Sequence, residues 1–154
     1  MDKYDDIARK VIDLIADEWI KQGHDLTGAF RERMQSEIVQ SYESTKINIY
    51  DTTERGYGII LNRGVRPENI KYPFARARIA GLTRYFKLRK GLDDKEALSA
   101  AFATAAKHKK EGMPTKDSEV FSQTGKRTQF VEDATKEIDE VVRELMNETV
   151  EAWL

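Results

Sequence analysis

Residues 37–62 read EIVQSYESTKINIYDTTERGYGIILN, and this stretch decides the fold class. Two parts of it, residues 47–50 and 57–61, are rich in β-branched and aromatic side chains, which favour strands. Residues 51–56 lie between them and have the composition of a hairpin connection. We therefore expect a small antiparallel sheet over residues 37–62, with a helix as the alternative for residues 57–61.

An amphipathic helix is expected before this sheet, over residues 4–22. Its apolar side chains recur at steps of three and four residues, and they are Ile7, Val11, Leu14, Ile15 and Trp19. This spacing places one apolar stripe along a helix that packs on a core. We expect Gly23 to end this helix and Thr27 to cap a short second helix, in which Phe30 and Met34 share a face.

A second long helix is expected after the sheet, over residues 130–154. Its apolar face lies opposite acidic residues and consists of Val131, Ala134, Ile138, Val141, Val142, Leu145, Met146, Val150 and Trp153. The fold class is therefore predicted to be α+β, with long N- and C-terminal helices packed on a small antiparallel sheet.

A helical insertion is expected between the sheet and the last helix, at residues 65–112. Residues 74–89 carry aromatic and aliphatic side chains at helical spacing, and the alanine-rich run 97–106 has a high helix propensity. Asp93 or Asp94 would cap the second of these helices. Together the two segments predict a helical hairpin.

Residues 107–129 lose this periodicity and collect glycine, proline, serine and lysine, which is typical of a long loop or arm. Loops of more than about 15 residues in a compact domain commonly carry function or become ordered on a partner. We expect fast amide exchange across this arm in the free protein. The chain is predicted to be one domain, 1–154, with a core of 1–64 and 113–154 and the insertion 65–112.

The composition excludes several classes of protein. The chain has 154 residues, of which 34% are charged, and it has no cysteine, so disulfides, thiolate zinc sites and cysteine nucleophiles are absent. No apolar run approaches the roughly 18 residues that a bilayer span needs. The first residues are acidic and do not resemble a signal peptide. We expect a soluble protein that is not exported and has no membrane partner.

The charges are sorted along the chain, although the formal net charge is only −1. Residues 1–62 hold 8 basic and 12 acidic side chains, residues 63–90 hold 9 and 1, and residues 91–154 hold 9 and 14. Such sorting suits head-to-tail packing of identical subunits, in which the basic segment of one copy meets an acidic face of the next. It equally suits a polyanion such as DNA.

The basic segment supplies the candidates for a subunit or DNA contact, which are Arg63, Arg66, Arg76, Arg78, Arg84, Lys87, Arg89 and Lys90. The aromatic residues among them are Tyr72, Phe74, Tyr85 and Phe86. Helical spacing places these rings on the apolar stripe, whereas base stacking needs exposed rings, so a helix face that is solvated or contacts protein is favoured over a DNA contact. The candidate contacts in the arm are Met113, Phe121, Lys126 and Arg127.

No arrangement of residues indicates catalysis or a metal site. His24 and His108 lie far apart, and neither has a second histidine three or four residues away; surface or loop positions are expected for both. Residues 125–128 are partly like a phosphate-binding loop, but Val120 stands where the first glycine is needed and Arg127 replaces the magnesium-binding hydroxyl. We expect a non-enzymatic protein without cofactor or metal, with a hidden pair of carboxylates as the enzymatic alternative.

Three short motifs follow one another between the expected end helices. They are Thr27-Gly28-Ala29-Phe30-Arg31, the interval from Tyr57 to Gly64, and Met113-Pro114-Thr115. In this order they resemble the motifs of tail-completion, or neck, proteins of tailed bacteriophages. The chain departs from the family pattern in having Arg33 in place of a common serine, Asn62 in place of the usual acid and Val65 in place of threonine.

This resemblance implies a structural virion protein of the head–tail connector, assembled in the host cytoplasm. Such proteins form a homo-oligomeric ring, commonly of six or twelve subunits, which contacts the portal or adaptor and the tail or other neck rings. Genomic DNA passes through the central channel. The inserted residues 65–112 are also similar to those of ring proteins in the necks of short-tailed phages. The alternative is a DNA-binding or packaging accessory protein that uses residues 63–90.

Overall fold

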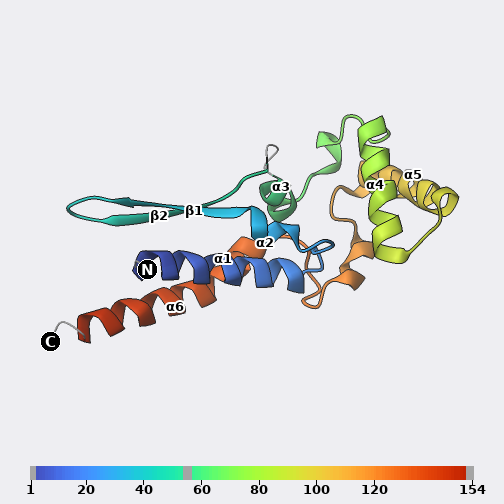
Figure 1. Cartoon of the computed structure of the whole chain (residues 1–154). Coiled ribbons are helices and arrows are strands. Elements are labelled where there is room, and N and C mark those ends of the chain that lie inside the picture. Colours follow the sequence, from blue (N-terminus) through green and yellow to red (C-terminus); the bar gives the residue numbers. More distant parts are fainter. Residues whose placement is uncertain (1–2, 54–56, 152–154) are drawn as a thin grey trace.

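The computed structural model describes residues 3–53 and 57–151, with side chains up to residue 147. Two long helices, α1 (Lys3–Lys21) and α6 (Phe130–Glu151), pack side by side, and the hairpin of β1 (Met34–Gln40) and β2 (Thr45–Asp51) lies along α1 (Figure 1). The α+β class, with long end helices and a small antiparallel sheet, is therefore confirmed. Trp153 and the side chain of Val150 lie outside the described residues.

The core lies between α1 and α6, and its buried side chains are Ile7, Val11, Ile15, Trp19, Phe130 and Ala134. The rings of Trp19 and Phe30 stack with their centroids 3.9 Å apart, and Phe130 meets both rings edge-on. Aromatic side chains bury more apolar area than other residues, so this cluster dominates the packing. The unit formed by α1, the two strands and α6 is called the body below.

The two strands pair antiparallel, with Ile38 opposite Ile47. Ile47 and Ile49 pack on the core, whereas Tyr50 beside them points outward, as the alternation along a strand requires. One face of the hairpin therefore covers α1.

The turn of the hairpin lies at residues 41–44, so its placement at residues 51–56 is wrong. The N–H of Ser41 donates to the carbonyl oxygen of Ser44 over 2.8 Å, and the N–H of Ser44 donates to the hydroxyl of Ser41 over 3.1 Å. Serine hydroxyls can close a turn in this way without glycine or asparagine, which is why the turn had no clear signal.

Residues 57–61 belong to a helix, α3 (Tyr57–Arg63), so their assignment to a strand is wrong. The carboxylate of Asp51 accepts from the N–H of Gly58 over 3.1 Å, and the hydroxyl of Thr53 accepts from the N–H of Tyr57 over 3.2 Å. These side chains satisfy amides that the start of a helix leaves unpaired. The buried positions of α3 are Gly58 and Asn62, while its exposed apolar side chains are Tyr57, Ile59 and Ile60.

The short second helix is α2 (Ala29–Arg33), and Thr27 does not cap it. Gly28 occupies the cap position, and its N–H donates to the carboxylate of Asp25 over 3.0 Å. The carboxylate of Asp25 therefore accepts a backbone hydrogen bond at the start of α2, which is the role expected of the Thr27 hydroxyl. Met34 begins β1 and does not continue the helix.

The inserted segment forms α4 (Arg76–Lys90) and α5 (Asp94–Glu111), which pack on each other and are called the helical hairpin below. Asp93, one of the two residues expected to cap α5, does so, and it forms a capping box with Glu96. Figure 1 shows the helical hairpin at one end of the molecule and the C-terminal end of α6 at the other.

Val65 and Met113 pair at the base of the helical hairpin, where they exchange two backbone hydrogen bonds of 2.8 Å. A single 3-10 turn, η1 (Pro67–Asn69), follows Val65, and the Met113–Pro114 peptide bond is cis. The two ends of residues 65–112 therefore lie side by side, and the chain returns to the body beside the point where it left.

Residues 107–111 are the last turn of α5, so the loop expected from residue 107 begins only at residue 112. A second 3-10 element, η2 (Lys116–Phe121), lies within it. The N–H of Gln123 donates to the carbonyl of Lys21 over 2.8 Å, and the N–H of Gln129 donates to the carbonyl of Asn62 over 2.7 Å. We therefore expect slow exchange at these amides, in place of fast exchange across the whole segment.

Candidate interaction surface

A groove of about 750 Å³ opens between α4 and α5, and we call it the α4–α5 groove. Three large apolar side chains line it and remain 49%, 44% and 47% exposed, namely Phe74, Leu98 and Phe102. The rings of Phe74 and Phe102 lie 6.1 Å apart. The groove is therefore an apolar surface that this chain leaves open.

Basic side chains of α4 surround this apolar surface. Arg76, Arg84 and Lys87 line the α4–α5 groove, and Lys87 pairs with Asp94. Arg76 and Arg84 are exposed and form no ion pair with any described carboxylate. Among the basic residues of the groove, these two arginines are the ones that are free to meet a partner.

Arg78 turns inward, so it is not part of a contact surface. Its Nη2 lies 3.2 Å from Nδ1 of His108 and 2.8 Å from Sδ of Met113. A guanidinium can only donate, so Nδ1 of His108 accepts and the imidazole is neutral. Burial, together with the charge of Arg78, lowers the pKa of His108 to about 4.

Arg127 makes a similar arrangement with the second histidine. The guanidinium of Arg127 donates to the carbonyl oxygens of Gln22 (3.3 Å) and Gly23 (3.1 Å). Nε2 of His24 lies 3.0 Å from the backbone carbonyl oxygen of Arg127. Burial, together with the charge of Arg127, lowers the pKa of His24 to about 4. Both histidines are half-buried beside arginines. His24 lies in the loop between α1 and α2, and a loop position was one of those expected, whereas His108 lies within α5, so the expectation is wrong for His108.

Phe121 joins the helical hairpin to the body. The cationic groups of Arg89, Lys90 and Arg127 lie 4.8, 5.6 and 5.9 Å from the centre of its ring, within the range of cation–π attraction. Arg89 also donates to the carbonyl oxygen of Asp25 over 3.1 Å. Arg89 and Phe121 therefore serve contacts within this chain.

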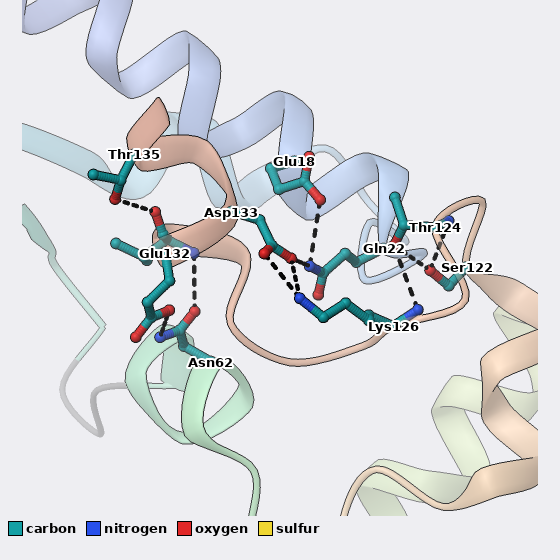
Figure 2. Close-up of polar contacts among 10 residues, drawn as sticks. Glu18, Gln22, Asn62, Ser122, Thr124, Lys126, Glu132, Asp133 and Thr135 are labelled. Atoms are coloured by element: carbon teal, nitrogen blue, oxygen red, sulfur yellow. Dashed lines mark hydrogen bonds and ion pairs between the residues drawn. The ribbon is translucent and has the colours of Figure 1, made fainter. Parts of the chain in front are cut away.

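Figure 2 shows the polar contacts that hold the loop before α6 against the body. Gln22 is fully buried and donates to Glu18 over 3.3 Å and to Asp133 over 3.1 Å. Lys126 reaches the same carboxylate of Asp133 over 2.8 Å. All four candidate contacts of the arm, Met113, Phe121, Lys126 and Arg127, thus have partners in their own chain.

The predicted basic strip is therefore not one continuous surface. Arg63 and Arg66 are exposed near the base of the helical hairpin, separate from the α4–α5 groove. The placement of all the aromatic residues on a buried stripe is wrong in part: Tyr72 is 78% exposed and Phe74 lines the groove, whereas Phe86 is buried.

A second hollow of about 760 Å³ lies between the body and the helical hairpin and includes Asp51, Tyr57 and Arg127. Burial raises the pKa of Asp51, but hydrogen bonds from Thr53 and Gly58 outweigh it, and the pKa is lowered overall. Asp51 is therefore ionised at neutral pH and acts as an acceptor for the start of α3.

No family model, curated protein or solved structure matches this chain. Within residues 3–53 and 57–151, no helix is long and apolar enough to cross a bilayer, and no three His, Asp or Glu side chains converge as metal ligands. The likeness to phage neck proteins therefore rests on the three motifs. In the structure the second and third motifs meet, because Gly64 lies beside the Val65–Met113 pair.

The sequence did not point to the apolar part of the α4–α5 groove. Leu98 and Phe102 lie in the alanine-rich run, where helix propensity was the dominant feature. Their spacing of four residues places them on one face of α5, and that was the available signal. Only the packing of α4 on α5 shows that Phe74 joins them.

Proposed function

We propose that this chain is a structural, non-enzymatic protein that forms a homo-oligomeric ring in the neck of a tailed-phage particle. There it would complete or attach the tail and let DNA pass. The observation that carries this proposal is the α4–α5 groove. It combines half-exposed aromatic and aliphatic side chains with unpaired arginines, and aromatic residues and arginine are enriched where proteins contact one another.

The projecting position of the helical hairpin supports a role in assembly. The hairpin is connected to the body at the Val65–Met113 pair and extends from one end of the molecule, where a neighbouring subunit can reach it (Figure 1). Further copies of the chain, the portal or adaptor, and tail or other neck proteins are the partners that the three motifs suggest. The protein would assemble in the host cytoplasm and become part of the virion.

Sedimentation velocity of the purified protein over a wide concentration range, alone and mixed with a portal ring, tests this function. We expect concentration-dependent assembly into a closed species, or binding to the portal ring, and ring-shaped particles by electron microscopy. A chain that stays monomeric at high concentration and ignores the portal would contradict the proposal.

A DNA-binding role is the second candidate, and exposed Arg76 and Arg84 beside Phe74 favour it. If it holds, the double variant R76A/R84A should bind duplex DNA more weakly, and the slope of log K against log salt should fall by about 2. The variant K109A/K110A removes the same charge from exposed positions of α5 that do not line the groove, and it serves as the control. Equal DNA binding by both variants and the wild type would remove this candidate.

A further inference from the structure

We propose that the α4–α5 groove receives the acidic outer face of α6 from the next copy of this chain. The inference rests on the proposed ring and names the contact between its subunits. Arg76 and Arg84 in the groove would then contact protein. The experiments below also detect binding of nucleic acid at these two arginines.

Charge complementarity identifies α6 as the occupant. The helix α6 contains eight acidic and two basic residues. Three of its acidic side chains, Asp139, Glu140 and Glu144, are exposed and have no ion-pair partner among the described residues. Arg76 and Arg84 in the α4–α5 groove are cations in the same situation. Opposite charges left unpaired on two surfaces of one chain favour contact between copies.

The arrangement of the two surfaces requires contact between different copies. The helical hairpin and the C-terminal end of α6 lie at opposite ends of the molecule (Figure 1), so one chain cannot fill its own groove. The other face of α6 is occupied, because α1 packs along it. A contact between unlike surfaces is heterologous, and it produces a closed ring when the rotation between subunits closes.

Charge reversal tests this contact. The variants R76E/R84E and E140K/E144K should each assemble roughly 100-fold more weakly than the wild type, since each sets like charges against each other. The quadruple variant, which carries both pairs, should regain assembly, and so should a mixture of the two double variants. The readouts are sedimentation velocity for mass and circular dichroism for the fold, and the four positions are exposed, so the chains should fold.

The double variant K109E/K110E serves as the matched control, because it makes the same change of charge outside the groove and should assemble as the wild type does. The inference is overturned if the wild type assembles and both R76E/R84E and E140K/E144K assemble equally well. A quadruple variant that stays dissociated overturns it as well. It is also overturned if R76E/R84E loses only binding to duplex DNA. A wild type that never assembles contradicts the proposed ring itself.

Discussion

Gly64 and Gly112 lie at the base of the helical hairpin, next to the Val65–Met113 pair. A side chain at either position would collide with the backbone segment that lies opposite it. Both have positive φ, +71° and +87°, and a Cβ would lie 2.7 Å from the carbonyl oxygen of Met113 at Gly64 and 2.5 Å from that of Val65 at Gly112. We predict that G64A and G112A each lower the free energy of unfolding by about 1–3 kcal/mol, because the replacement adds both strain and a clash. Urea unfolding measures this change.

Gly81 supplies the control for these two substitutions. It lies inside α4, and nothing stands within 4 Å of the Cβ that alanine would add. G81A should therefore raise the free energy of unfolding by up to about 1 kcal/mol through helix propensity. If G64A and G112A unfolded at the same urea concentration as the wild type, the close approach at the base would be refuted.

The two histidines predict that the protein loses stability in mild acid. Each is neutral in the folded state, with a pKa lowered from 6.5 to about 4, so the unfolded chain takes up the protons first as the pH falls. The neutral histidines contribute fully to the free energy of unfolding above pH about 6.5, and this contribution is lost as the pH falls from there towards 4. The urea midpoint should therefore drop between pH 7 and pH 5.

Removing the imidazoles isolates this effect. Glutamine at each position can accept from Arg127 or Arg78 without titrating, so H24Q/H108Q should lose less stability between pH 7 and pH 5 than the wild type does. Carboxylates such as Asp51, whose pKa is lowered, titrate below this window and act equally in both proteins. Identical pH dependence of the two chains would contradict the neutral, buried state of the histidines.

At the scale of secondary-structure elements, Asn62 connects α3 to α6. Its Oδ1 accepts from the N–H of Val131 over 3.0 Å, and its Nδ2 donates to Glu132 over 2.8 Å (Figure 2). We predict that N62A costs about 1–2 kcal/mol of stability, because a first-turn amide of α6 loses its acceptor. N62D keeps that acceptor but faces the carboxylate of Glu132, so it should also destabilise.

The double variant N62D/E132Q distinguishes this explanation from simple loss of packing. The side-chain amide that E132Q introduces can donate to the new carboxylate, so thermal unfolding of N62D/E132Q should occur above that of N62D. Additive losses would show that the Asn62–Glu132 contact is not the cause.

The helices α1, α4, α5 and α6 could be predicted from the sequence because their signals are local. In α1 the apolar period matches the buried face, and α5 follows the capping residue Asp93. In α6 the predicted face is right at Ala134, Ile138, Val142 and Leu145, but Val131 and Met146 are exposed and Phe130, which was not predicted, is buried. The helix α3 reverses this pattern: its buried positions are Gly58 and Asn62, so its apolar residues suggested a strand. Its start depends on Asp51, seven residues before Gly58, and that contact exists only in three dimensions.

For the candidate site, the sequence predicted only where the charged residues lie along the chain. Sequence counts located the basic segment, but they do not show that Arg78 and Arg89 turn to partners in their own chain. Long-range packing sorts the arginines into those that stabilise the fold and those that remain free. The same packing brings Phe74 to Phe102, which no local pattern could indicate.

For the whole molecule, the position of the helical hairpin relative to the body depends on a few contacts around Phe121. Its ring lies near three cations, two from α4 and one from the loop before α6, and its backbone lies against Gly23 at the end of α1. The ring is therefore the point at which α4, η2 and the end of α1 meet. In the proposed ring this position would have to be fixed, because the angle between the two proposed contact surfaces would set whether the assembly closes.

Replacing Phe121 with alanine should loosen this junction. The cations would lose the ring face that attracts them, so F121A should speed amide exchange at Gln123 about tenfold or more while the β1–β2 hairpin exchanges as in the wild type. V120A is the control, since Val120 is the preceding residue and is 79% exposed. Hydrogen exchange measures the junction, and small-angle scattering should show a larger radius of gyration for F121A alone. If V120A and F121A behaved alike, the helical hairpin would owe its position to the Val65–Met113 pair at its base and not to the cations around this ring.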